Sequence, residues 1–285
     1  MKLQIQHFFD PATSTLTYVV ADQQTRDAVI IDPVWDYDPA SGKMSTDSMQ
    51  PVLAFIQEHK LNPHYVLETH AHADHLSSSQ LFKNYFPQIK IAIGERIVEV
   101  QKIFKDVFNM KGLEPTGCEF DLLLKDGQEL QAGSLKIKTI FTPGHTPACA
   151  SYLIEDALFA GDAIFMPDYG TGRCDFPAGS AEDLYDSVKN KIYALPDKTR
   201  IFVGHDYQPH GRSLEFQTTV GEEKKTNIQL KETTTREDFI RFRKERDATL
   251  AAPKLLLPSI QVNIRAGHLP EAEDNGQRYL KLPLR

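Results

Sequence analysis

The first two thirds of the chain alternate short apolar runs with stretches of helical spacing. The apolar runs have the length and β-branched content of buried strands, and they cover residues 16–20, 28–31, 65–68, 90–93, 135–141, 151–154, 158–160 and 200–203. Apolar positions recur at helical spacing over residues 52–60, 77–86 and 181–195. Residues 36–49, which are rich in Asp, Ser, Pro and Gly, predict a loop insertion. Because strands here alternate with helices, the pattern predicts an α/β fold.

The last third of the chain has a different pattern. Two long stretches of helical spacing cover residues 212–230 and 236–250, and a tail rich in Pro, Leu and Asn begins at Pro253. We therefore expect one catalytic domain over residues 1–211. Residues 212–285 are expected to form a C-terminal helical extension and a tail packed on the same domain.

Composition and charge narrow the possible partners. The chain has 285 residues, of which 41% are hydrophobic and 25% charged, as in an ordinary globular protein. Its formal net charge of -7 argues against nucleic acid or a membrane surface as a partner. We find no apolar stretch of transmembrane length and no signal-peptide pattern. The three scattered cysteines, Cys118, Cys149 and Cys174, are too few for a disulfide framework, so we expect a cytoplasmic protein.

The segment from Thr69 to His75, with the sequence THAHADH, carries the strongest chemical signal in the chain. It follows the predicted strand at residues 65–68, and loops at strand ends commonly carry functional groups. Its ligand-type residues are His70, His72, Asp74 and His75. Neutral imidazole and carboxylate together suit zinc or iron, and the segment contains no cysteine. Four such residues within six positions predict a metal site.

Three further predicted strands end in a ligand-type residue. His145 follows the strand at residues 135–141, Asp162 follows the strand at 158–160, and His205 follows the strand at 200–203. A glycine precedes each of these residues, and glycine permits a tight turn or a close backbone approach at a strand end. The full order HxHxDH, His, Asp, His is more specific than any one of these residues, and it indicates one shared metal site.

This order of residues resembles the metallo-β-lactamase superfamily from about residue 16 to residue 210. The resemblance implies an αβ/βα sandwich with the metal at one edge of two packed sheets, but the fold alone does not fix the reaction. In dizinc hydrolases such as glyoxalase II, the residues that correspond to His70, His72 and His145 bind one metal. Those that correspond to Asp74, His75 and His205 bind the second metal, and the counterpart of Asp162 bridges the two. In the persulfide dioxygenases a single iron takes the residues that correspond to His70, His145 and Asp162.

Segments outside the ligands favour the persulfide dioxygenases. Residues 169–176 resemble the Gly-x-Gly-Arg-x-Asp-Phe segment of that family, and residues 204–207 match its Gly-His-Asp-Tyr segment. Residues 34–39, 246–250, 258–265 and 273–276 resemble the bacterial members. All seven dizinc ligands are intact, so a glyoxalase II-type hydroxyacylglutathione thioesterase with two zinc ions is the alternative.

The resemblance thus implies an iron-dependent persulfide dioxygenase that oxidises glutathione persulfide with O₂ and water to sulfite and glutathione. It implies one Fe(II) per chain at His70, His145 and Asp162. The other four ligand-type residues, His72, Asp74, His75 and His205, would form a vacant second site that tunes the first. A homodimer is also expected from the resemblance.

Four residues are expected to act on the substrate or beside the iron. Arg173 is our first candidate for binding a substrate carboxylate, and the alternative is an ion pair with Asp175. Tyr169 is expected to contact the tripeptide unless it is a solvated loop residue, and Thr146 is a further substrate-binding candidate. Tyr207 is expected to be a catalytic residue that hydrogen-bonds near the iron, with a core tyrosine as the alternative.

Overall fold

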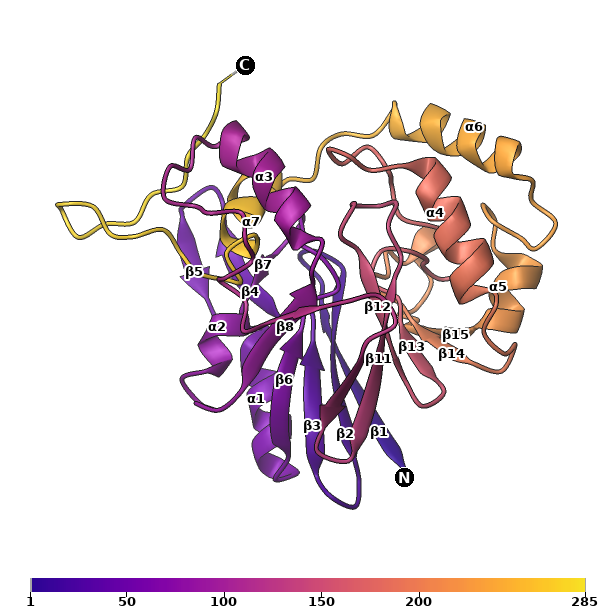
Figure 1. Cartoon of the computed structure of the whole chain (residues 1–285), viewed down its shortest axis with the longest axis horizontal. Helices are drawn as coiled ribbons and strands as arrows, with labels where there is room; N and C mark the ends of the chain where they lie inside the picture. The colour runs from indigo at the N-terminus through magenta and orange to yellow at the C-terminus, as the bar shows by residue number, and fades with distance from the viewer. Residues whose placement is uncertain (1, 285) are drawn as a thin grey trace.

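Two six-stranded β-sheets packed face to face form the centre of the protein (Figure 1). The computed structural model describes residues 2–284. The first sheet has the strand order β1-β2-β3-β6-β8-β9, the second β10-β11-β12-β13-β14-β15, and a small third sheet β5-β4-β7. The strands are β1 (Leu3–Asp10), β2 (Thr15–Asp22), β3 (Asp27–Ile31), β4 (Val34–Asp38), β5 (Lys43–Ser45), β6 (Asn62–Leu67), β7 (Leu76–Ser77), β8 (Lys90–Gly94), β9 (Leu122–Leu124), β10 (Glu129–Ala132), β11 (Leu135–Phe141), β12 (Ala150–Ile154), β13 (Ala157–Phe159), β14 (Arg200–Phe202) and β15 (Gln217–Thr219).

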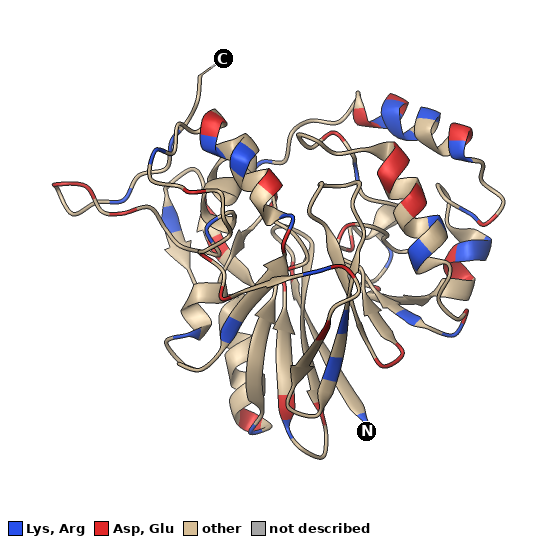
Figure 2. Cartoon of the chain, in the orientation of Figure 1, with Lys and Arg blue, Asp and Glu red and all other residues tan. Residues whose placement is uncertain are grey.

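Helices flank the two sheets (Figure 1). They are α1 (Met49–Glu58), α2 (Ser79–Phe82), α3 (Ile97–Val107), α4 (Ala181–Ser187), α5 (Val220–Thr226), α6 (Arg236–Asp247) and α7 (Leu256–Asn263), with a π-helical turn at Val188–Ile192 and a 3₁₀ turn at Pro209–Gly211. Ser180, Thr219 and Thr235 cap α4, α5 and α6, because each side chain accepts a hydrogen bond from the backbone N–H three residues ahead. Charged side chains gather on these helices, whereas the central strands carry few (Figure 2). Within residues 2–284, no helix has both the length and the apolar composition that a membrane span requires.

Strand β2 explains how one sheet supports two hydrophobic cores. All eight of its residues are buried, and successive side chains of a strand point to opposite faces. Leu16, Tyr18 and Val20 join the core that also contains the second sheet, whereas Val19 and Ala21 join the core formed with α1 and α3. The α/β sandwich expected from the sequence is confirmed.

Several elements differ from the sequence prediction. Residues 36–49 are not a simple loop, because β4 and β5 pair there as an antiparallel hairpin. The helix predicted over residues 212–230 forms only in part, as α5 (Val220–Thr226). Residues 212–215 are not helical, because the Asp206 carboxylate accepts hydrogen bonds from the Arg212 guanidinium and the Glu215 N–H. The chain then forms β15, which pairs with β14. The sequence analysis also missed β1, α3 and α7, and the domain division at residue 211 stays a prediction.

Both sheets present the carboxyl ends of their central strands at one edge. Strands β3, β6 and β8 are parallel, and β11, β13 and β14 share one direction because β12 lies antiparallel between β11 and β13. Backbone hydrogen bonds of 2.9 Å join the sheets at this edge, from Leu16 N–H to Gly204 O and from Ala150 N–H to Thr69 O. The loops after β6, β11, β13 and β14 therefore meet there.

Candidate metal centre

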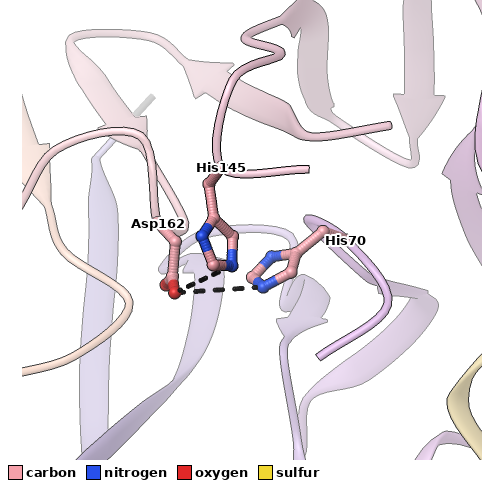
Figure 3. A group of neighbouring side chains, drawn as sticks. All are labelled: His70, His145 and Asp162. Atoms are coloured by element: carbon pink, nitrogen blue, oxygen red, sulfur yellow. Dashed lines mark ion pairs between the residues drawn. The ribbon is translucent and has the colours of Figure 1, made fainter. Parts of the chain in front are cut away.

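Three ligand-type side chains converge from three strand ends (Figure 3). His70 follows β6, His145 follows β11 and Asp162 follows β13, and one ligand atom of each lies within 4.8 Å of the others. His70 Nε2 lies 4.0 Å from Asp162 Oδ2, and His145 Nε2 lies 3.5 Å from the same oxygen. All three residues are buried. The structure thus brings together the two histidines and the carboxylate expected to hold a single metal.

The other ring nitrogen of each histidine has a fixed partner. His145 Nδ1–H donates to the carbonyl oxygen of Arg173 at 2.7 Å, and His70 Nδ1 lies 2.9 Å from the hydroxyl oxygen of Thr69. These contacts leave Nε2 of both rings facing Asp162. Burial and the neighbouring histidines hold the pKa of His70 well below its ordinary value, so its imidazole is neutral, as metal ligation requires.

The residues present fit a bound metal. His70 Nε2 and Asp162 Oδ1 are buried with no hydrogen-bond partner among the described residues, and so are His75 Nε2 and Asp74 Oδ2. Burial of such atoms is costly unless something satisfies them. A divalent cation satisfies imidazole nitrogens and carboxylate oxygens together, and this donor set is one that iron and zinc accept.

A second group of ligand-type residues adjoins the first. His72, Asp74 and His75 have ligand atoms within 4.8 Å of one another. His205 Nε2 lies 3.2 Å from Asp74 Oδ2 and 3.4 Å from Asp162 Oδ1, so Asp162 faces both groups. All seven ligand-type residues singled out from the sequence therefore meet at one sheet edge.

His72 is held differently from the other histidines. Its Nε2 lies 3.0 Å from Asp32 Oδ1 and 3.4 Å from Glu68 Oε2, and all three side chains are buried. Burial alone would lower the pKa of His72, but the charges of Asp32 and Glu68 raise it well above its ordinary value. The Nε2 atom of His72 thus lies between two carboxylates.

The sequence analysis missed Asp32 and Glu68. Asp32 directly follows β3 and accepts hydrogen bonds from the Thr69 N–H at 2.7 Å and the Thr69 hydroxyl at 2.8 Å. Glu68 directly follows β6, and its other oxygen accepts from the hydroxyls of Ser77 and Ser79. Both carboxylates directly follow a strand, as the ligand-type residues do, and this position could have marked Asp32 and Glu68 as site residues in the sequence.

Glycines allow the close approach of the loops, as expected from the sequence. Gly161 has φ +51°, and a Cβ there would lie 2.7 Å from the Thr69 hydroxyl. A Cβ on Gly204 would lie 2.9 Å from Asp162 Oδ1. A side chain at either position would displace the ligand loops.

A cleft of about 840 Å³ opens onto the two groups of ligands. One wall is aromatic and includes Phe165, Tyr169 and Tyr207. The Tyr207 ring stacks between that of Tyr169, 4.6 Å away, and that of His205, 5.6 Å away. Other walls come from the turn between β1 and β2, from the β4–β5 hairpin, and from α6 and the segment between α6 and α7. A cleft of this size accommodates a small organic substrate beside the metal.

This geometry agrees with the comparisons to known proteins. The family model described as "Metallo-beta-lactamase superfamily" matches residues 10–205. The chain belongs to the metallo-β-lactamase superfamily. A solved member, ETHE1 from Myxococcus xanthus, superposes with a TM-score of 0.74 at 30% identity, covering 93% of this chain and 100% of that one.

Two curated superfamily relatives carry different names. Glyoxylase B2 of Dictyostelium discoideum is 48% identical over 285 residues, which cover 99% of this chain and 97% of that protein. The mitochondrial persulfide dioxygenase ETHE1 of Homo sapiens is 31% identical over 265 residues, 92% of this chain and 88% of that protein. The superfamily is thus established, and the reaction has to be argued from the site.

The structure places the expected substrate residues in different surroundings. The Arg173 guanidinium forms a two-pronged ion pair with Asp175 and donates to the Ala251 carbonyl at 2.8 Å, so the alternative contact foreseen from the sequence is present. Thr146 is buried, and its hydroxyl lies 3.1 Å from Cys149 Sγ. Tyr169 lines the cleft. The substrate-binding roles of these residues stay predictions.

Asn263, on α7, ties the C-terminal segment to the ligand loop. Its amide donates to the carbonyl oxygens of His72 and His75 at 2.8 and 2.7 Å, and its oxygen accepts from Ser77 N–H at 2.8 Å. The sequence analysis missed this residue, because 186 positions separate it from Ser77, the nearest of these three partners in the sequence.

 The contacts with His75 and His72 span 188 and 191 positions, and contacts over such separations leave no local pattern in the sequence.

We expect Asn263→Leu to weaken both the fold and the metal site. The change leaves two buried carbonyl groups and one N–H without partners, which costs about 2–4 kcal/mol of unfolding free energy. Metal affinity should fall by roughly one order of magnitude, because the carbonyls it holds orient the ligand loop. Chemical denaturation and metal titration of the same preparations measure the two effects.

Gln261→Leu is the matched control, because Gln261 is a buried amide on the same helix that bonds to Leu257 and Lys281 instead of the ligand loop. It should lower stability and leave metal affinity unchanged. An equal loss of affinity in both variants would show that Asn263 acts only on overall stability.

Proposed function

We propose that this protein is a persulfide dioxygenase that holds one Fe(II) at His70, His145 and Asp162. In the proposed reaction, glutathione persulfide, O₂ and water become glutathione, sulfite and two protons. The outer sulfur of the persulfide is oxidised to sulfite, the S–S bond breaks, and O₂ is reduced. The ligand set and the relatives named as persulfide dioxygenases support this reaction class.

The position of His72 carries this proposal. In the dizinc arrangement the side chain of His72 has to join His70 and His145 around one metal. Here its Nε2 lies instead between Asp32 and Glu68. The remaining set of two histidines and one carboxylate is the arrangement that non-haem Fe(II) oxygenases use, and it leaves coordination positions open for two reactants.

When bound, the iron supplies the electron chemistry that no side chain performs and a place where persulfide and O₂ meet. The chain's own residues position the metal ligands and line the substrate cleft. The Arg173 carbonyl orients His145, Thr69 contacts His70, and the stacked rings of Tyr169 and Tyr207 line one side of the cleft. The persulfide needs no general base, because it is already an anion when it binds.

A dizinc thioesterase of the glyoxalase II type is the second candidate. It is favoured by the name of the 48% identical relative and by the second group of ligand-type residues around Asp162. Zinc, when bound, would supply an activated water for hydrolysis of an acylglutathione thioester. The two candidates share the glutathione moiety and differ in metal and in the need for O₂.

An oxygen-electrode assay on metal-replete protein tests the proposal. We expect O₂ uptake with glutathione persulfide, sulfite in a one-to-one ratio to O₂ consumed, and no sulfite under anaerobic conditions. Hydrolysis of lactoylglutathione, measured in parallel, should be absent. Thioester hydrolysis without O₂ uptake would replace the dioxygenase by the second candidate.

The variant His205→Ala separates the two metal arrangements. Under the proposal His205 is not an iron ligand, so the iron content per chain should stay within about a fifth of the wild-type value. A dizinc site would lose a ligand of its second metal, and total bound metal would fall by about half. His268→Ala, at an exposed position after α7, is the control. Elemental analysis of the wild type and the two variants measures the iron and zinc content per chain.

A further inference from the structure

The cationic side chains that line the cleft are not equally free to bind a substrate. Arg173 is paired with Asp175, and Arg243 is buried and paired with Asp247 at 2.6 Å. Arg246, which lines the same cleft from α6, has no Asp or Glu oxygen within 4.0 Å in the described part of the chain. Its charge is therefore available to a ligand.

The surroundings of Arg246 connect it to the metal centre. Its guanidinium lies next to the hydroxyl of Tyr169, where it opposes the rise in the Tyr169 pKa that burial causes. The Tyr169 ring stacks on Tyr207, which stacks on His205. His205 in turn lies 3.4 Å from Asp162. Arg246 thus stands at the far end of an aromatic wall that begins at the proposed iron ligands.

The cleft needs such a cation if its substrate is an anion. The chain has a net charge of -7, and Asp10, Asp74 and Asp162 line the cleft. Lys43 and Lys254 also line it, from the β4–β5 hairpin and from the segment between α6 and α7. A guanidinium binds a carboxylate through paired hydrogen bonds, which fixes the orientation of the ligand as well as its charge.

We propose that Arg246 binds a carboxylate of the thiol-bearing substrate and that Tyr169 holds the Arg246 guanidinium in place. This inference rests on the proposed function, in which the substrate is a persulfide of a small peptide with carboxylates. The persulfide end lies at the metal and the carboxylate end at Arg246, with the aromatic wall between them. Arg246 is a specificity-determining residue, because a persulfide without a carboxylate gains nothing from it.

The variant Arg246→Gln tests the inference. With glutathione persulfide, we expect KM to rise roughly tenfold to a hundredfold, because a charge-assisted pair is lost, while kcat changes little. With an alkyl persulfide that lacks a carboxylate, kcat/KM should equal that of the wild type. Arg246→Lys should recover only part of the affinity, because an ammonium cannot form the paired contact.

Arg241→Gln is the matched control, since Arg241 lies on the same helix, is exposed and pairs with Asp238. It should behave as the wild type with both persulfides. Wild-type KM in Arg246→Gln, or an equal loss with both persulfides, would overturn the inference.

Calorimetric titration with glutathione separates this inference from the proposed function. If wild-type protein takes up no O₂ with glutathione persulfide, the dioxygenase fails, but binding of glutathione still tests Arg246. At least tenfold weaker binding to Arg246→Gln than to Arg241→Gln would support the contact. Equal binding to both variants would overturn it.

Discussion

Histidine and carboxylate side chains are buried together where the two sheets meet, and most of the local structure follows from the cost of that burial. A buried imidazole or carboxylate without a partner is expensive, and a buried charge is more so. Different contacts offset this cost for different side chains. His145 bonds to a backbone carbonyl, His72 lies between two carboxylates, and the atoms left over face one another around Asp162.

Some ring nitrogens and carboxylate oxygens of the site have hydrogen-bond partners in the protein and others have none, and those without partners can bind a metal ion. Atoms with protein partners are the nitrogens that fix ring orientation, whereas those without partners, such as His70 Nε2 and Asp162 Oδ1, are the ones a metal ion takes. His72 Nε2 lies close to the carboxylates of Asp32 and Glu68, although neither of its ring nitrogens makes a hydrogen bond among the described residues.

The C-terminal segment completes the site from outside the two sheets. Asn263 on α7 binds the carbonyls of the ligand loop. Asp247 on α6 accepts the Cys174 N–H at 2.8 Å, next to the Arg173 carbonyl that orients His145. The helices beyond residue 211 thus contact both sides of the candidate metal centre.

The α/β sandwich and the meeting of seven ligand-type residues at one sheet edge could be predicted from the sequence, because strand-end position and spacing are local signals. The sequence predicted poorly where a residue outside the segment decides the outcome. Asp206, which lies outside the segment, accepts hydrogen bonds from Arg212 and Glu215 and keeps residues 212–215 out of the helix that their spacing predicts. The pairing of His72 with Asp32 spans 40 residues and depends on the parallel alignment of β3 and β6. No pattern within one segment contains that information.

Anomalous diffraction at the iron and zinc absorption edges, from crystals of protein purified with its native metal, tests the central claim most directly. The account predicts one iron peak per chain, bound by His70 Nε2, His145 Nε2 and the Asp162 carboxylate, with His72 Nε2 still beside Asp32. Two zinc peaks about 3.5–4 Å apart, with His72 bound to one of them and His205 to the other, would contradict it.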